Sequence, residues 1–275
     1  MLDRRSTAYS GRVAHISLKG VVEAAEFTTG VVQQIGVPVA DLLAAPAGAR
    51  ERQLCYGEAF TVLDQQDGYA YGFADKDGYC GWVHDAQLVD YTPPTHWVAS
   101  PATHSYTQPR VQAPETHLLP MGARVRVAGQ SGMFSETELG FIPTVHLLPL
   151  GTALNDPVSV AERLLGTPYL WGGNTRSGID CSGLVQVALL SCGIACPGDS
   201  DQQQALGRAL LSHEQPGRGD LIFWRGHMGL VVDSDRLIHA NGHTMSVAFE
   251  WLAPCISRIA QQNGGEVTHI RRLKD

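Results

Sequence analysis

The stretch PYLWGGNTRSGIDCSGLV, residues 168–185, decides how the second half of this chain folds. Its glycines are typical of a loop, and Asp180 is a residue type that commonly caps the N-terminus of a helix. After it, leucine, valine and alanine residues recur near the helical period until Gly193, which suits a helix C-terminus. The pattern predicts that Cys181 lies in the first turn of a largely buried helix.

A thiol in that position has a distinct chemistry. The first turn of a helix carries backbone N–H groups without intrahelical partners, and together with the macrodipole they favour a negative charge. We therefore expect the pKa of Cys181 to be lowered, which raises its fraction of nucleophilic thiolate. Such a nucleophile also requires a base within hydrogen-bond reach and a third group that orients the base.

Histidines in a predicted hairpin downstream can supply both partners. Short strands rich in branched and aromatic residues are predicted at 220–224 (DLIFW), 227–232 (HMGLVV) and 236–240 (RLIHA). If residues 233–235 form a three-residue loop, His239 is diagonal to His227 on the same face, about 7–8 Å away between backbone positions. A two-residue loop would place the two histidines on opposite faces. Asn241 and His243 are alternatives to His239 as the orienting group.

Five motifs in this order carry a resemblance to a known family: PYLWGG, DCSGLV, GDLIFW, GHMGLVV and LIHAN. From Asn155 to about Ile259 the chain resembles the NlpC family of papain-like cysteine peptidases, which cut bacterial cell-wall peptides. The resemblance implies that Cys181 is the nucleophile and that His227 is the general base and acid. It also implies that His239 is the polar residue that orients His227.

The same resemblance extends to residues around the nucleophile. Tyr169, in the PYLWGG motif, resembles a residue that helps to bind the oxyanion beside the backbone N–H of Cys181. Trp171, in the same motif, is predicted to contact the substrate. Asp199 and Ser200, in PGDSDQQ, are candidates for the leaving-group side, where they would bind a second amine. They can equally cap the helix that is predicted just after them.

The first half of the chain has a different pattern. After a weakly patterned leader at 1–35, short apolar segments separated by turn residues predict small all-β modules. We predict one module at 36–92 and a second at 95–149. A linker then leads into the catalytic domain, which is predicted at 155–275.

The two β modules are related in sequence. Set side by side, matched positions are Gly57 and Gly122, Val62 and Val127, and the steps Gly81-Trp82-Val83 and Gly140-Phe141-Ile142. Such an internal duplication indicates two copies of one unit. Both copies resemble bacterial SH3-like domains. The predicted fold class is therefore α+β, with two small all-β SH3-like barrels followed by a papain-like α+β catalytic domain.

Within the NlpC family, this architecture resembles a subgroup of cytoplasmic dipeptidyl-type peptidases in which the first SH3-like module caps the groove. The resemblance implies that a carboxylate and a tyrosine of that module, with the residues flanking the nucleophile, hold the free N-terminal amine of the substrate. In this chain they are Glu58, Tyr79, Asp180 and Ser182. A buried ammonium must meet a carboxylate, because its desolvation is otherwise costly. For a tyrosine in a β module, packing in the core is the alternative.

Composition narrows the possible partners. The chain has 275 residues with 20 Lys and Arg against 27 Asp and Glu, a net charge of −7 that argues against nucleic acid as the main partner. No segment approaches the roughly 20 apolar residues that span a bilayer, so no membrane partner is expected. The N-terminal residues lack the apolar stretch of a secretion signal, which predicts a cytoplasmic protein. The oligomeric state stays open.

Six cysteines are scattered along the chain, as is typical of proteins from a reducing compartment. Cys192 and Cys196 form a CxxxC pair, but no second ligand pair of convincing spacing accompanies them, so no metal site is predicted. The expected hydrolysis requires no metal and no other cofactor.

The sequence thus predicts a cysteine peptidase. By resemblance, its substrate is a murein-derived peptide with a free N-terminal L-alanine, cut between the γ-carboxyl of D-glutamate and a diamino acid during recycling of wall fragments. Two alternatives from other classes remain: a papain-like amidase or acyltransferase without the capping role, and a non-catalytic cell-wall-binding protein. The identity of the diamino acid is not predicted.

Overall fold

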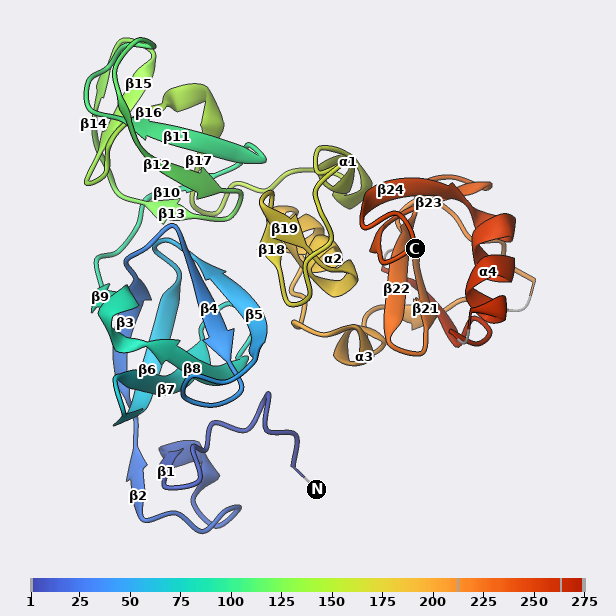
Figure 1. Ribbon diagram of the computed structural model, residues 1–275, viewed down its shortest axis with the longest axis horizontal. Coiled ribbons are helices and arrows are strands. Elements are labelled where there is room, and N and C mark those ends of the chain that lie inside the picture. The colour runs from blue at the N-terminus through green and yellow to red at the C-terminus, as the bar shows by residue number, and fades with distance from the viewer. Residues whose placement is uncertain (1, 212, 263, 274–275) are drawn as a thin grey trace. The chain divides into compact units, whose positions relative to one another are not determined.

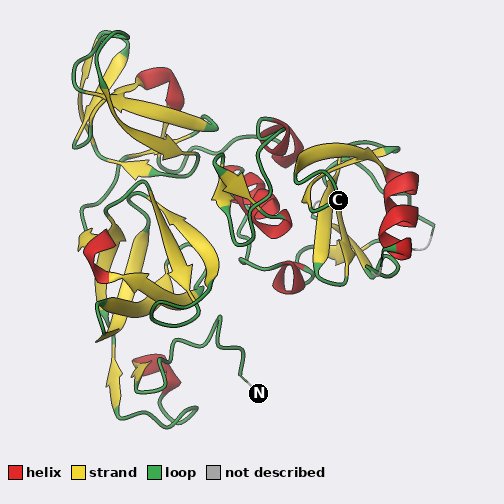
Figure 2. Ribbon diagram, viewed as in Figure 1, coloured by secondary structure: helices red, strands yellow, loops and turns green. Residues whose placement is uncertain are grey.

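The computed structural model describes residues 2–211, 213–262 and 264–273 of the chain, drawn in Figure 1. The chain divides into two compact units, Met1–Leu150 and Gly151–Asp275. The first unit consists of strands with short 3₁₀-helices, and the second combines strands with the α-helices of the described residues, as Figure 2 shows. The predicted change from an all-β first half to a mixed second half is confirmed for this part of the chain.

An antiparallel sheet forms the first module of the first unit. Alternating apolar side chains of its strands meet in a core that includes Ile35, Leu42, Leu54 and Phe60, all fully or almost fully buried. This burial is why the short apolar segments of the sequence form strands here. In sheet order the strands are β5 (Arg50–Cys55), β4 (Val39–Leu43), β8 (Cys80–His84), β7 (Tyr69–Ala74), β6 (Ala59–Gln66), β3 (Val31–Ile35) and β9 (Leu88–Asp90).

The segment predicted as a leader is packed onto this module. Its last strand, β3, belongs to the sheet, because it pairs with β6 and β9. Before it, β1 (Val13–His15) and β2 (Glu26–Thr28) form a small parallel pair, with a 3₁₀-helix η1 (Ile16–Leu18) between them. The N–H of Cys80 donates to the carbonyl of Arg5 at 2.7 Å, and the N–H of Tyr9 donates to the hydroxyl of Tyr71 at 3.1 Å. The first module therefore begins with β3 rather than at residue 36.

The second module repeats the end of the first. In the first, β8, the 3₁₀-helix η2 (Asp85–Gln87) and β9 follow one another, and in the second the order is β16, η3 and β17. One sheet has the order β12–β11–β16–β15–β14 and the other the order β13–β10–β17. The elements are β10 (His96–Val98), β11 (Ala102–Tyr106), β12 (Glu115–Pro120), β13 (Arg124–Val125), β14 (Val127–Ser131), β15 (Phe134–Thr137), β16 (Gly140–Pro143), η3 (Thr144–His146) and β17 (Leu147–Pro149).

The two modules of the first unit share part of their core. Tyr56 packs in one apolar cluster with residues of the second module, and its carbonyl accepts from the N–H of Arg124 at 2.7 Å. Gly57 follows with a φ of 72°, and a Cβ built there would lie 2.0 Å from the carbonyl oxygen of Arg124. Glycine at position 57 therefore permits both the left-handed backbone and the close approach.

The second unit is built on an antiparallel sheet with the order β20–β25–β21–β22–β23–β24. The predicted strands of the histidine hairpin are confirmed as β21 (Leu221–Trp224), β22 (His227–Val231) and β23 (Arg236–Asn241). The apolar side chains of these strands are buried against the helices that cover the sheet. The remaining strands are β24 (Ser246–Trp251), β25 (His269–Arg272) and β20 (Arg208–Ala209), with the small pair β18 (Asn174–Thr175) and β19 (Gly178–Ile179) before Cys181.

Helices flank this sheet. The central helix α2 (Cys181–Ser191) packs against β22 and β23, and α4 (Leu252–Gln261) packs against β24. Ile222, Trp224 and Leu237 of the sheet form one apolar cluster with Cys255 and Ile259 of α4. The other helices are α1 (Pro157–Glu162) and α3 (Ser200–Gln203). Within the described residues, no helix combines the length and the apolar character that crossing a bilayer would require.

Candidate active site

The predicted helix start at the cysteine is confirmed. Helix α2 begins at Cys181, and Asp180 is its N-cap. The buried carboxylate of Asp180 accepts hydrogen bonds from the N–H of Gly183 at 2.6 Å, the N–H of Gly172 at 2.8 Å and the hydroxyl of Ser182 at 3.0 Å. One carboxylate thus caps the helix and ties the glycine loop to it. It places the thiol of Cys181 beside the N–H groups of the first turn.

Tyr169 lies on the same loop, close to Cys181. It forms a parallel bridge with Ile179, and its N–H donates to the carbonyl of Met245 at 2.9 Å. Burial raises the pKa of the Tyr169 phenol, and the negative charges of Cys181 and Asp180 raise it further. The phenol therefore stays protonated and remains a hydrogen-bond donor. Trp171, two residues on, is 69% exposed.

The two histidines lie on one face of the sheet, as predicted. Trp224 pairs with His227 across a two-residue turn, and Leu230 pairs with Ile238 across the loop 233–235. This register puts His239 diagonal to His227 on the neighbouring strand. The Nε2 atom of His227 lies 2.9 Å from the Nδ1 atom of His239.

His239 is the candidate orienting residue whose ring contacts His227. The Oδ1 atom of Asn241 accepts from the N–H groups of His243 at 2.9 Å and Thr244 at 2.8 Å, so this side chain shapes the turn after β23. His243 lies on that turn and is exposed. The register of the hairpin explains why His239, and not Asn241 or His243, contacts His227, because it brings the ring of His239 toward β22.

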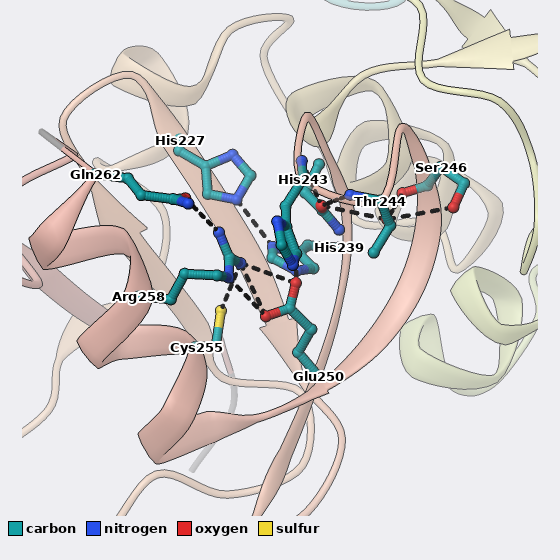
Figure 3. A network of polar contacts seen from close by, with 10 residues as sticks. His227, His239, His243, Thr244, Ser246, Glu250, Cys255, Arg258 and Gln262 are labelled. Atoms are coloured by element: carbon teal, nitrogen blue, oxygen red, sulfur yellow. Dashed lines mark hydrogen bonds and ion pairs between the residues drawn. The ribbon is translucent and has the colours of Figure 1, made fainter.

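Two charged residues that the sequence did not reveal complete this cluster. The Nε2 atom of His239 lies 3.2 Å from Oε1 of Glu250 on β24. Glu250 in turn accepts bonds of 2.8, 2.8 and 3.2 Å from the guanidinium of Arg258 on α4 (Figure 3). The pairing of β23 with β24 is the feature that could have predicted Glu250. Ala248 lies opposite His239, and Glu250 is two residues further along β24 on the same face.

The cluster sets the charges of its members. Burial lowers the pKa of His227 to about 3, and the neighbouring His239 and Arg258 lower it further, against the opposing effect of Glu250. The hydrogen bond from His239 lowers the pKa of Glu250 to about 2, and Arg258 contributes in the same direction. At neutral pH His227 is therefore a neutral base and Glu250 an ionised acceptor.

Three residue types that can bind metal ions lie close together in this cluster. Ligand atoms of His239, Glu250 and Cys255 all lie within 4.8 Å of one another. However, Nη2 of Arg258 lies 3.6 Å from the sulfur of Cys255 and also binds Glu250, so a positive charge already occupies this position. Burial raises the pKa of Cys255 to about 12, which keeps the thiol protonated. The arrangement suits an arginine ion pair and not a cation site.

Asp199 and Ser200 lie at a helix start. Asp199 occupies the N-cap position of α3, and Ser200 is the first residue of that helix. The same short helix supplies Gln203, which is fully buried. Its Nε2 atom donates to the carbonyl oxygens of Ser182 at 3.1 Å and Pro197 at 2.9 Å. Gln203 therefore links α3 to the first turn of α2, a contact that the sequence did not predict.

Glu58 and Tyr79 are both buried in the first module. The carboxylate of Glu58 accepts from the N–H of Cys55 at 2.9 Å and pairs with the ammonium of Lys76 at 2.8 and 2.9 Å. Tyr79 packs in the apolar core of the module. The ion-pair partner Lys76 was not expected from the sequence, in which it is one of several charged residues in a turn.

Comparisons with known proteins agree with this site. The profile of the NlpC/P60 family matches residues 166–262, and the profile of the bacterial dipeptidyl-peptidase Sh3 domain matches residues 42–88. A gamma-D-glutamyl-L-lysine dipeptidyl-peptidase of Bacillus cereus (strain ATCC 10987 / NRS 248) is 26% identical over 70% of this chain and 68% of its own length. The protein of the same name from Bacillus subtilis (strain 168) is 27% identical over 69% of this chain and 72% of its own length.

A solved structure shows the same fold. The crystal structure of an NlpC/P60 family protein from Bacillus cereus ATCC 10987 matches with a TM-score of 0.74 and 20% identity, covering 88% of this chain and 99% of that chain. The chain thus carries a bacterial dipeptidyl-peptidase SH3 domain followed by an NlpC/P60 domain, and it is a cysteine peptidase.

Proposed function

We propose that this peptidase cuts murein peptides with a free N-terminal L-alanine, between the γ-carboxyl of D-glutamate and a diamino acid, during cytoplasmic recycling of wall fragments. The observation that carries the catalytic part is the pair His227 and His239, 2.9 Å apart on the strands against which the helix of Cys181 packs. Two relatives named gamma-D-glutamyl-L-lysine dipeptidyl-peptidase support the substrate class. The scattered cysteines, four of them buried besides Cys181, suit a reducing compartment.

The proposed reaction is amide hydrolysis through a thioester. His227 takes the proton of the Cys181 thiol, and the thiolate attacks the carbonyl carbon to form a C–S bond. The resulting imidazolium gives its proton to the leaving amine as the C–N bond breaks. Water, deprotonated by the same histidine, then attacks the thioester and releases the acid and the thiol of Cys181.

Tyr169 and the backbone N–H of Cys181 are proposed to bind the oxyanion of the tetrahedral intermediate. Two features support this role. Helix α2 begins at Cys181, so its N–H belongs to the first turn, where backbone N–H groups point out of the helix end. The phenol of Tyr169 stays protonated near Cys181, because burial and nearby negative charge raise its pKa. Donors of this kind act where charge develops in the transition state.

The substrate amine is proposed to bind Asp180 and Ser182, with Glu58 and Tyr79 of the first module. Asp180 is buried directly before Cys181, and a buried ammonium requires a carboxylate partner. We further propose that the second β module is a second SH3-like copy. Exposed Trp171 and the start of α3, Asp199 and Ser200, are proposed to line the substrate path.

One observation favours a second candidate, an NlpC/P60 wall peptidase that does not select a free amine. Glu58 is already neutralised by Lys76, with both side chains about 8% exposed. An incoming ammonium would share this carboxylate with a positive charge, which lowers the electrostatic gain from binding. If Lys76 keeps Glu58 occupied during turnover, amine selection would depend on Asp180 alone.

A comparison of three substrates tests the proposal. Purified protein is incubated with L-Ala-γ-D-Glu-L-Lys, with the same tripeptide acetylated at the N-terminus, and with intact sacculi. Cleavage of the free tripeptide and at least about 100-fold slower cleavage of the acetylated one is the expected result, because the acetyl group removes the ammonium. Equal rates for both tripeptides support the second candidate, and cleavage of none of the three rejects both.

A further inference from the structure

A line of contacts runs from the catalytic histidine into the interior of the second unit. His227 Nε2 lies 2.9 Å from His239 Nδ1, and His239 Nε2 lies 3.2 Å from Oε1 of Glu250. Arg258 clamps Glu250 with its Nε and Nη2 atoms at 2.8–3.2 Å. Figure 3 shows the four side chains following one another from β22 through β23 and β24 to α4.

The carboxylate of Glu250, at the inner end of this line, determines which nitrogens of His239 and His227 carry a proton. A carboxylate that is ionised can only accept hydrogen bonds, so His239 Nε2 must carry the hydrogen that points to Glu250. In neutral His239 the Nδ1 atom then holds a lone pair and accepts. His227 Nε2 must therefore be the donor of the 2.9 Å contact, and the lone pair of His227 is left on Nδ1.

We propose that Glu250 is a positioning residue that sets the tautomers of His239 and His227, and that Arg258 holds Glu250 in place for this purpose. With both tautomers set, Nδ1 of His227 is the basic atom that takes the proton of Cys181. The inference rests on the proposed roles of Cys181 and His227 as nucleophile and base. Glu250 touches neither the substrate nor the reacting atoms, so it acts through the two rings.

The surroundings favour this role. The His239 side chain is 0% exposed and that of Glu250 16%, so water competes little for their contact. Two titratable or charged groups of α4 face the line, the buried thiol of Cys255 and the guanidinium of Arg258. Burial keeps the thiol protonated, and the arginine compensates the charge of Glu250. A planar guanidinium bound through two nitrogens also restricts how the carboxylate can turn.

The reverse tautomer would stop the reaction. If His239 carried its hydrogen on Nδ1, His227 Nε2 would have to accept, and His227 Nδ1 would carry a hydrogen and could not act as a base. In Ser-His-Asp hydrolases, an amide in place of the orienting carboxylate lowers kcat about 10⁴-fold for this reason. Here one more ring separates the carboxylate from the base, so a smaller effect is expected.

The substitution Glu250→Gln tests the proposal. The amide oxygen would be drawn to Arg258, and the NH₂ group would then face His239 and stabilise the reverse tautomer. We expect kcat to fall about 100-fold with KM changed less than about 3-fold, since substrate contacts are untouched. Imidazole ¹⁵N chemical shifts should show His227 Nδ1 unprotonated in the native protein and protonated in the variant.

Glu214→Gln is the matched control. It replaces another carboxylate of the second unit that binds an arginine through two nitrogens, with Arg208 Nη1 at 2.8 Å and Nη2 at 2.9 Å. We expect native kcat and native ¹⁵N shifts for the control. Glu250→Asp keeps the charge and should recover part of the activity that Glu250→Gln loses.

Two results would overturn the proposal. One is native kcat for Glu250→Gln in a folded protein. The other is a ¹⁵N spectrum of the native protein in which His239 Nε2 is unprotonated, a measurement that needs no variant to fold. Because the spectrum also needs no substrate, it separates this inference from the proposed function: expected tautomers in a protein that cleaves no peptide would reject the function alone.

Discussion

The Nε2 atom of His227 lies 2.9 Å from the Nδ1 atom of His239, although the two residues are 12 positions apart in the chain and a hairpin loop lies between them. The contact exists because the loop 233–235 sets a register in which both side chains lie on the same face. On the other side, His239 contacts Glu250, so a fully buried ring connects the half-buried ring of His227 to the ion pair of Glu250 and Arg258. His227, the proposed base, is thus held by a contact to the neighbouring strand as well as by its own strand.

Replacing the nucleophile should remove turnover without removing the fold. In Cys181→Ala the sulfur is lost, but Asp180 still caps α2 and the histidine pair is untouched. We expect no detectable hydrolysis of the tripeptide and a peptide Kd within about 3-fold of native, measured by calorimetry. Cys192→Ala, at the C-cap of the same helix, should keep native activity. Residual hydrolysis by Cys181→Ala would disprove the assignment of the nucleophile.

Closing the space between the hairpin strands should displace His239. A Cβ at Gly229 would lie 2.7 Å from Leu237 Cδ1 and 3.3 Å from the Cβ of His239. We expect Gly229→Val, which adds still more volume, to lower kcat at least about 10-fold because the His227 contact lengthens. Gly217→Ala is the control, since its Cβ would meet only an arginine side-chain atom at 3.7 Å. Native kcat in folded Gly229→Val would contradict the register argument.

Breaking the buried ion pair of the first module should destabilise the protein. Lys76→Met leaves the carboxylate of Glu58 buried without its cation, and removal of one partner of such a pair costs about 3–5 kcal/mol. Urea unfolding should therefore show a lower free energy of unfolding. Lys76→Met with Glu58→Gln should recover part of the loss, because no unpaired charge remains. Lys19→Met, at an exposed lysine, serves as the control. Equal stability of all variants would exclude a structural role for the pair.

The stability of the protein should decrease in mild acid because of His227. In the unfolded chain this histidine takes up a proton below its ordinary pKa of 6.5, whereas in the folded protein its pKa is lowered to about 3. The unfolded state therefore binds more protons between these values, and the free energy of unfolding falls as the pH drops from about 6.5. Glu250, whose pKa is lowered from 4.5 to about 2, adds a similar loss only below about pH 4.5.

Between pH 6.5 and 4.5 the effect of His227 on stability is thus separated from that of Glu250. We expect His227→Gln to lose less stability than the native protein between pH 7 and pH 5, measured by urea unfolding at both values. His213→Gln, at an exposed histidine of the same unit, should behave as the native protein does. The same pH dependence in His227→Gln and the native protein would show that the His227 ring is not kept neutral by burial.

Local sequence patterns determined the centre of this site. The cap at Asp180, the helix start at Cys181 and the hairpin that carries His227 and His239 all depend on neighbouring residues, through capping chemistry and the two-residue period of strands. These interactions are short in sequence, so residue types alone predict them.

Tertiary structure decided the shell around that centre. Glu250 and Arg258 reach His239 only because β24 pairs with β23 and α4 folds back onto the sheet. Lys76 finds Glu58 in the same way, since β6 and β7 lie side by side and bring the two residues together. Charged residues of this kind look like ordinary surface residues in the sequence. Strand order and helix packing determine which opposite charge lies next to each of them, and no local pattern encodes either. A buried charge is costly unless an opposite charge lies next to it, so these pairs depend on the tertiary structure.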